Sequence, residues 1–442
     1  METPKEFIEE TKELLEFIKK SPTPFHAVKN IADMLKDEGA EELFENERWN
    51  LECGKAYFVK RNDTSVISFR LPESAESTEG TYGSETAIPK LKIIASHSDS
   101  PSFKIKEAPE LKKSGHYLEL NVEKYGGALL NPWFDRPLSI AGRVIADADG
   151  ELQSILIDFD KDMVLIPSLA IHMNREANDG TKIDVQKTMM PLWGDESSEG
   201  AFNEALKEEL KKQGLTNGEI LGYDLYLYNR VEPSIWGEGE KFFSAGRIDD
   251  LLCAYESVKA FNETKATDSI NVCVVFDNEE VGSATKQGAD STFLSDVIDR
   301  IAMCLKIDDE AKKILISKSF MVSADNAHAL HPNFADKADP VNAPVLNGGV
   351  VIKYNAAQKY TTDAYSGAYF KKLCIENDVP YQIYTNKSNI AGGSTLGNIS
   401  NTHVAMNTVD IGAPQLAMHS PYETAGTKDA LHMLRAMKVF YE

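Results

Sequence analysis

The sequence has few cysteines and no excess of positive charge. The cysteines are odd in number and widely spaced, which argues against a disulfide framework and favours reduced thiols in a reducing compartment. The formal net charge of −22 at pH 7 argues against a nucleic-acid partner, because such binding depends on Lys and Arg neutralising phosphates. The five cysteines are Cys53, Cys253, Cys273, Cys304 and Cys374.

The sequence also lacks long apolar runs. No uninterrupted apolar stretch approaches the length that crosses a membrane. Residues 1–6 are acidic and lack the basic and apolar segments of a secretory signal. We therefore expect a soluble cytoplasmic protein with no membrane partner. With 42% hydrophobic residues among 442, the chain is long enough to bury a large core.

A buried strand followed by adjacent carboxylates is the most informative pattern that is present. Residues 272–276 are all apolar, which is typical of a parallel strand covered on both faces, and Glu279 and Glu280 follow soon after. Ligands of open α/β sheets bind where such strands end. Two adjacent carboxylates stay ionised there only if positive charge is close, and a metal pair would supply it. Taken alone, the stretch fits a solvated acidic turn better.

The same pattern recurs at four other places, which favours a metal site over a solvated acidic turn. An apolar run leads in each case to a residue that can bind a metal: His97, Asp249, Asp325 or His419. Mixed imidazole and carboxylate donors suit zinc, cobalt or manganese. Carboxylates can also bridge two ions ~3.5–4 Å apart.

The middle of the chain has a different texture from its ends. The apolar runs at 138–145 and 152–159 flank Asp147-Ala148-Asp149-Gly150, which predicts a β-hairpin. Before and after this region the pattern alternates between strand and helix, as in α/β folds. Residues 72–87 are rich in Ser, Glu, Thr and Gly and predict a surface loop. We expect an α/β domain, residues 1–103 and 236–442, interrupted by a β-rich insert at 104–235.

Near the N-terminus, two helices are expected. Apolar residues from Phe7 to Ile18 repeat at helical spacing. Thr23 followed by Pro24 is typical of an N-cap and first position of a second helix.

Seven stretches, in order across nearly the whole chain, resemble the M18 metallopeptidases, the aspartyl aminopeptidase family. Any one of them is a weak signal, whereas seven in order are a strong one. They are His97-Ser98-Asp99-Ser100-Pro101, Asn131-Pro132-Trp133-Phe134-Asp135-Arg136-Pro137-Leu138, Arg247-Ile248-Asp249-Asp250-Leu251, Asp277-Asn278-Glu279-Glu280-Val281-Gly282-Ser283, Ser323-Ala324-Asp325-Asn326-Ala327-His328-Ala329, Gly393-Ser394-Thr395-Leu396-Gly397 and Pro414-Gln415-Leu416-Ala417-Met418-His419-Ser420.

The resemblance implies a zinc-exopeptidase-like catalytic domain with a mixed sheet, and a site with two divalent metal ions, zinc foremost and cobalt or manganese as alternatives. Asp249 would bridge the ions. His97 and Asp325 would complete one coordination shell, and Glu280 and His419 the other. Glu279 would be the general base, and Asp99 would orient the imidazole of His97.

The resemblance also implies substrate-binding residues. Lys353, with Tyr360 seven residues on, would line the pocket for the substrate side chain and favour acidic ones. Asp363 departs from the family's Asn, and a carboxylate near Lys353 would weaken that preference. His172 has two equally supported interpretations: a structural histidine, or a residue that enters the neighbouring subunit's site. His328 and His331 we expect to be structural or to support the ligands.

The function implied is hydrolysis of the N-terminal residue from short peptides, with acidic N-termini as a candidate preference. The insert would make dimers, and the dimers a dodecamer. Two alternatives stay open from the sequence. One is a related two-metal carboxypeptidase or N-deacylase, which would not need a free α-amine. The other is a non-enzymatic self-assembling shell protein, against which the complete set of candidate ligands argues.

Overall fold

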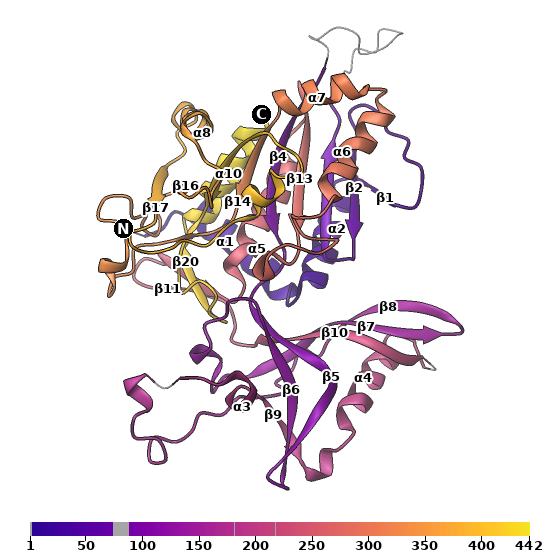
Figure 1. Cartoon of the computed structure of the whole chain (residues 1–442), viewed down its shortest axis with the longest axis vertical. Helices are drawn as coiled ribbons and strands as arrows, with labels where there is room; N and C mark the ends of the chain where they lie inside the picture. Colours follow the sequence, from indigo (N-terminus) through magenta and orange to yellow (C-terminus); the bar gives the residue numbers. More distant parts are fainter. Residues whose placement is uncertain (1, 74–87, 181, 217) are drawn as a thin grey trace.

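The computed structural model describes residues 2–73, 88–180, 182–216 and 218–442. The loop expected at 72–87 falls almost wholly outside these residues. Among the described residues the strands form three sheets (Figure 1). The expected α/β fold, with a mixed central sheet and a separate antiparallel sheet, is confirmed. No helix in the described ranges is long and apolar enough to span a membrane.

The central sheet carries the strands that matter for the site. Four adjacent strands in the middle of the sheet run parallel to one another: β13, β4, β14 and β18. On either side of them, β3 pairs antiparallel with β13, and β16 pairs antiparallel with β18. The order in the sheet is β1 (Glu41–Leu43), β2 (Ala56–Arg61), β3 (Ser65–Arg70), β13 (Ser269–Phe276), β4 (Lys90–His97), β14 (Phe320–Ala324), β18 (Asn407–Gly412), β16 (Val350–Tyr354) and β17 (Tyr381–Thr385).

Successive side chains of β13 point to opposite faces of the sheet, and both faces are buried, which explains its continuous apolar sequence. Val272 and Val274 pack into the core on one face, whereas Cys273 and Val275 pack into the core on the other. Helices therefore cover both faces of the sheet. One face packs against α1 (Lys5–Lys20), α2 (Pro24–Asp37), α5 (Ile248–Glu263), α8 (Ala364–Glu376) and α10 (Asp429–Tyr441), and the other against α6 (Phe293–Cys304), α7 (Asp309–Lys318) and α9 (Leu396–Ser400).

The six-stranded antiparallel sheet lies below the central sheet in Figure 1 and has its own core. Its predicted hairpin is confirmed, with Asp149 and Gly150 at positive φ in the turn. The order is β8 (Glu151–Asp158), β7 (Leu138–Ala148), β10 (Glu219–Asn229), β5 (Ser102–Lys113), β6 (Tyr117–Tyr125) and β9 (Leu192–Asp195).

A helix that the sequence analysis did not anticipate covers this second sheet. α4 (Ala201–Lys212) buries Phe202, Leu206 and Leu210, which are spaced by four residues on one helical face. The short helix α3 (Val185–Thr188) lies earlier in the same region.

All strands of the third sheet follow those of the six-stranded sheet in the sequence. Its order is β11 (Ser234–Trp236), β12 (Phe242–Ala245), β20 (Glu423–Gly426), β19 (Pro414–Leu416) and β15 (Ala327–His328). The two N-terminal helices form as expected, but the side chain of Thr23 does not cap α2. Its Oγ1 lies 2.9 Å from Nδ1 of His26 instead. All five cysteines have free thiols.

Glu256 is a buried acid that the fold does not compensate. It lies on α5 with no solvent exposure, and in the described part of the chain neither carboxylate oxygen has a hydrogen-bond partner. The nearby ammonium of Lys259 is bonded to Glu10 and Glu13. Burial, reinforced by the charge of Glu10, raises the pKa of Glu256 well above its usual range.

We predict that Glu256→Met stabilises the protein increasingly as the pH rises. A raised pKa in the folded state means that the unfolded chain loses this proton first, so wild-type stability falls as the pH rises above about 4.5. The gain in free energy of unfolding should be smallest near pH 5 and reach ~1–3 kcal/mol by pH 8, measured by urea unfolding at constant zinc. Glu263→Met, at the exposed end of the same helix, is the control; a gain independent of pH would contradict the prediction.

Candidate metal centre

Three neighbouring strands deliver candidate ligands to one edge of the central sheet. β4 ends at His97, and Phe276 at the end of β13 lies opposite it in the parallel register. The turn after β13 carries Glu279 and Glu280. On the other side of β4, strand β14 ends one residue before Asp325. The parallel register explains why residues far apart in sequence meet at this edge.

The remaining candidates come from outside this sheet. Asp249 and Asp250 stand at the start of α5 with non-helical backbone, so the regular helix begins after them. His419 lies between β19 and β20 of the third sheet. Glu423, buried on β20, accepts the backbone N–H of Asp249 (3.0 Å) and of His419 (2.7 Å), and so ties the two segments together.

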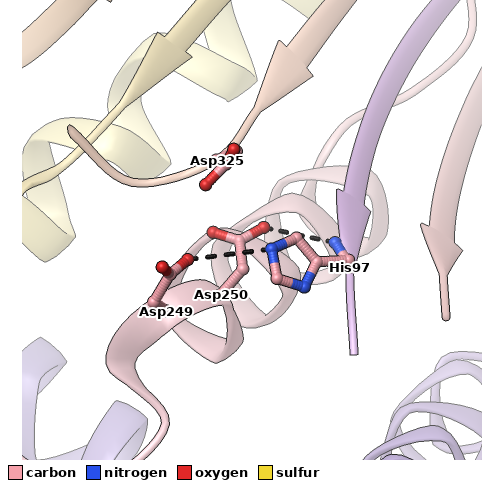
Figure 2. A group of neighbouring side chains, drawn as sticks. All are labelled: His97, Asp249, Asp250 and Asp325. Atoms are coloured by element: carbon pink, nitrogen blue, oxygen red, sulfur yellow. Dashed lines mark hydrogen bonds and ion pairs between the residues drawn. The ribbon is translucent and has the colours of Figure 1, made fainter. Parts of the chain in front are cut away.

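The possible metal-binding atoms of these residues form overlapping groups. Within each group, every such atom lies within 4.8 Å of the others. His97, Asp249, Asp250 and Asp325 make one fully buried group (Figure 2). A second contains Asp249, Glu280 and His419, and a third contains His97, Glu279 and Glu280. Glu279 and Glu280 are partly exposed as whole residues, but the side chain of Glu280 is only 3% exposed.

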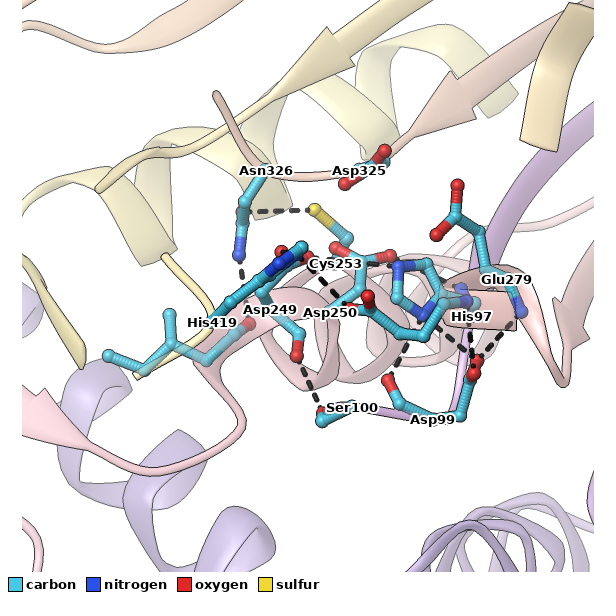
Figure 3. Close-up of polar contacts among 12 residues, drawn as sticks. His97, Asp99, Ser100, Asp249, Asp250, Cys253, Glu279, Asp325, Asn326 and His419 are labelled. Atoms are coloured by element: carbon cyan, nitrogen blue, oxygen red, sulfur yellow. Dashed lines mark hydrogen bonds and ion pairs between the residues drawn. The ribbon is translucent and has the colours of Figure 1, made fainter. Parts of the chain in front are cut away.

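Asp249 stands between two imidazoles. Nε2 of His97 lies 3.7 Å from Oδ1 of Asp249, and Nε2 of His419 lies 3.4 Å from Oδ2. Each carboxylate oxygen therefore faces a different histidine. Figure 3 shows the two rings on opposite sides of Asp249.

Asp99 packs against the outer nitrogen of His97. Its Oδ1 lies 3.2 Å from Nδ1 of His97, and its backbone oxygen lies 3.1 Å from the same atom. The carboxylate also accepts the backbone N–H groups of Glu279 (3.1 Å) and Glu280 (3.2 Å). One buried aspartate therefore fixes both the ring of His97 and the turn that carries the two glutamates.

The cluster carries more negative charge than its own cations neutralise. Burial raises the pKa of Glu279 to about 8, with His97 opposing and Asp325 adding to the rise. Burial likewise raises the pKa of Glu280 and of Asp250 well above the usual range. Burial opposes ionisation of Asp249 as well, but the bond from His419 and the charge of His97 keep its pKa below the usual value.

This donor set fits divalent metal ions. Oδ1 of Asp249, Oδ1 of Asp250 and Oε1 of Glu280 are buried and have no hydrogen-bond partner in the described part of the chain. Buried polar atoms are nearly always paired, so three unpaired oxygens at one point fit a site that binds a cation. Imidazole nitrogen and carboxylate oxygen are the donors that zinc accepts in catalytic sites.

Comparisons with known proteins agree with this chemistry. Residues 17–441 match the family model described as "Aminopeptidase I zinc metalloprotease (M18)". A probable M18 family aminopeptidase 2 of Clostridium novyi (strain NT) is 43% identical over 432 residues, which cover 97% of this chain and 98% of the relative.

The chain belongs to the M18 family.

Solved structures show the same architecture. The structure of the Ape4 and Nbr1 complex includes a chain that is 33% identical, with a TM-score of 0.91 over 100% of this chain and 87% of that one. The S. cerevesiae mApe1 dodecamer is 25% identical, with a TM-score of 0.82 over 97% of this chain and 95% of that one. The protein is thus a zinc metalloaminopeptidase, which sets aside the carboxypeptidase, deacylase and shell-protein alternatives.

Two of the expected substrate residues of this M18 aminopeptidase lie behind the cluster. Lys353 is 1% exposed, and its Nζ donates to the backbone oxygens of Asp325 (2.7 Å) and Asn326 (3.3 Å). The same atom lies 3.6 Å from Oδ2 of Asp325 and 5.1 Å from the ring centre of Tyr360. The ammonium of Lys353 is therefore bonded to the Asp325–Asn326 segment, and its role in the pocket for the substrate side chain stays a prediction.

Two further expectations concern Asp363 and His172. Asp363 caps α8 through Ser366, which gives its carboxylate a structural role there. His172 is exposed in the six-stranded part of the chain, between the exposed side chains of Ile171 and Met173. No contact found among the described residues joins His172 to the cluster of the same chain.

Sequence reasoning missed three residues that shape the site of this M18 aminopeptidase. Asp250 is one of the four residues of the buried group, and its Oδ2 accepts the backbone N–H of His97 at 3.2 Å. Its position next to Asp249 was the only available signal. Glu423 and Tyr125, whose hydroxyl donates to Asp99 at 2.6 Å, carry no pattern that distinguishes them in the sequence.

A pocket of about 400 Å³ adjoins the cluster of the M18 aminopeptidase. Gln415 lines it and donates to Glu423, which holds the backbone of His419, so the pocket and the cluster share a wall. None of the described residues lining it is Asp or Glu, although the chain as a whole is strongly acidic. Its imidazole and ammonium side chains are those of His328, His331, Lys337 and Lys387, and we call it the basic pocket.

Proposed function

We propose that this M18 aminopeptidase removes the N-terminal residue of short peptides with two zinc ions that share Asp249. The observation that carries the proposal is the position of Asp249, with one oxygen toward His97 and the other toward His419. His97 and Asp325 would hold one ion, with Asp250 close by, and Glu280 and His419 the other.

Glu279 is the proposed general base. Its carboxylate lies in the same group of donor atoms as His97, and its backbone N–H donates to Asp99. It takes a proton from the attacking water onto a carboxylate oxygen and returns it to the leaving nitrogen. When bound, the zinc ions polarise the scissile carbonyl and lower the pKa of water. The carboxylates near the ions would help to hold the free α-amino group of the substrate, which restricts cleavage to the first residue.

We predict that Glu279→Gln lowers kcat by ~10²–10⁴ because the variant lacks the base, while its zinc content stays at the wild-type level. Asp249→Ala, in contrast, should lose zinc and activity together, because both ions depend on it. Elemental analysis and peptide turnover measure the two quantities. Zinc-depleted Glu279→Gln would make Glu279 a ligand, and full activity after thorough chelation would overturn the metal mechanism.

The basic pocket supports a preference for acidic N-terminal residues. Nζ of Lys387, which is half-buried, donates to the backbone oxygen of Asp336. Nζ of Lys337 lies 3.9 Å from the carboxylate of Asp336, and both side chains of this ion pair are exposed. Such exposed pairs are weak, so both ammonium groups remain available to a carboxylate. Lys353, one layer behind Asp325, adds positive charge to this side of the site.

We predict that kcat/KM for an N-terminal Glu substrate exceeds that for the Gln analogue, and that Lys337→Met/Lys387→Met lowers this ratio about tenfold, equivalent to ~1.4 kcal/mol. Matched peptides with either N-terminal residue measure it. Lys211→Met, on α4 outside the pocket, is the control. A ratio of one in the wild type would refute the acidic preference and leave the aminopeptidase chemistry intact.

We also propose that residues 104–235 form a dimerisation insert between the two parts of the catalytic domain, 1–103 and 236–442. Exposed apolar side chains in this region support self-association: Leu165, Leu169, Ile171, Met173 and Leu192. The related yeast structure is a dodecamer, and we propose dimers that assemble into the same kind of particle. His172, amid these side chains, would enter the neighbouring site.

We predict a mass near twelve subunits by light scattering. Mixing inactive His172→Ala with inactive Glu279→Gln should restore part of the activity, because some hybrid sites combine an intact His172 with an intact Glu279. Subunit exchange is verified with two differently tagged chains. A fully active monomer, or no recovery despite verified exchange, would refute the shared site.

A further inference from the structure

A short segment after β6 links the six-stranded sheet to the metal cluster. We call residues 125–129 the glycine strap. The backbone oxygen of Gly127 accepts a hydrogen bond from Nδ1 of His419 at 3.2 Å, and the backbone N–H of Leu129 donates to the oxygen of His419 at 3.0 Å. At the start of the strap, the hydroxyl of Tyr125 donates to Asp99 at 2.6 Å.

The bond to Gly127 decides which nitrogen of His419 faces the cluster. With Nδ1 donating to a carbonyl oxygen, the lone pair of the ring lies on Nε2. Nε2 is the atom that points at Oδ2 of Asp249 (3.4 Å) and Oε1 of Glu280 (3.3 Å). The ring of His97 is held in the same sense by Asp99, with Nδ1 outward and Nε2 toward Asp249 (Figure 3).

The two histidines nevertheless depend on different parts of the fold. Asp99 follows His97 by two residues at the end of β4, in the central sheet. Gly127 follows β6, which belongs to the six-stranded sheet. One ring is therefore oriented from within its own sheet, and the other from a neighbouring unit of structure.

Because they have no side chain, both glycines of the strap also leave room for the proposed ligands His419 and Glu280. A Cβ on Gly127 would lie 3.3 Å from Nδ1 of His419, and a Cβ on Gly126 would lie 3.0 Å from Cβ of Glu280. Contacts this short force the neighbour to move. His419 itself has a positive φ of 69°. Two hydrogen bonds help to hold this conformation: Leu129 N–H donates to the oxygen of His419, and His419 N–H donates to the carboxylate of Glu423.

We propose that the glycine strap sets the zinc affinity of the position formed by His419 and Glu280, with Gly127 as a positioning residue. The inference rests on the ligand set proposed above. It means that the two zinc positions respond unequally to any displacement of the six-stranded sheet. The His419 position weakens more than the His97 position, because Asp99 holds the ring of His97 from the central sheet and touches the strap only through Tyr125.

Gly127→Ala tests the proposal with a single added methyl group. The backbone of Gly127 is not in the left-handed region, so the substitution acts through its contact with His419. We expect about 10–100-fold weaker binding of one of two zinc ions, the range for loss of a group that orients a ligand, with the other ion unaffected. Competition with a chromogenic chelator measures both affinities. Gly222→Ala, on β10 with nothing within 4 Å of its added Cβ, is the matched control.

A second pair of variants keeps the test decisive if Gly127→Ala does not fold. Gly126→Ala and Gly115→Ala introduce the same backbone strain, since both glycines have φ of 72°, but only Gly126 adjoins Glu280. Weaker zinc binding in Gly126→Ala alone supports the proposal. The proposal is overturned if Gly127→Ala and Gly222→Ala lose the same zinc affinity, or if Gly126→Ala and Gly115→Ala do.

His419→Ala separates this inference from the ligand assignment. Loss of one zinc ion in His419→Ala, together with wild-type affinities in Gly127→Ala, would overturn the role of the strap and leave the ligand set standing. Two tightly bound zinc ions in His419→Ala would overturn the ligand set itself, and the inference with it.

Discussion

Crowding of carboxylates around Asp249 is the constraint on which the site depends. Asp249, Asp250, Asp325, Glu279 and Glu280 converge with two imidazoles and one buried ammonium, that of Lys353. In a low-dielectric interior this surplus charge is costly unless cations neutralise it. Burial, together with the charge of neighbouring carboxylates, raises the pKa values of Asp250 and Glu280, and three buried carboxylate oxygens lack a hydrogen-bond partner in the described part of the chain. Divalent metal ions resolve both, and the zinc chemistry of the M18 family supplies them.

The fold meets this constraint by bringing rigid elements together at one edge of the central sheet. Three adjacent strands end there, and their parallel register sets His97, the glutamate turn and Asp325 at one level. The start of α5 adds Asp249 and Asp250, and the third sheet adds His419. Positive φ values at Arg247, Asn278 and His419 show where the backbone bends to aim these side chains. Such strain persists because buried partners, among them Asp99 and Glu423, hold the segments in place.

Much of the fold was predictable because its signals are local. The apolar run of β13, the Asp149–Gly150 turn and the helical spacing of the first helices each depend on residues adjacent in sequence. The ends of apolar runs also singled out all five proposed ligands, because each ligand follows such a run directly or within a few residues. The helix α4 was missed although Phe202, Leu206 and Leu210 carry its period, because the surrounding strand pattern dominated.

By itself, then, the sequence determined the fold class, the type of metal donors and the family, because strand ends and ligand types leave short, ordered motifs. Only the tertiary structure decided what surrounds them. Lys353 reaches Asp325 instead of solvent, Glu423 ties Asp249 to His419, and the carbonyl of Gly127 orients a ring almost three hundred residues away. These contacts join segments with no shared local pattern. Their partners are chosen by packing and by the need to satisfy buried polar groups, which spacing along the chain does not encode.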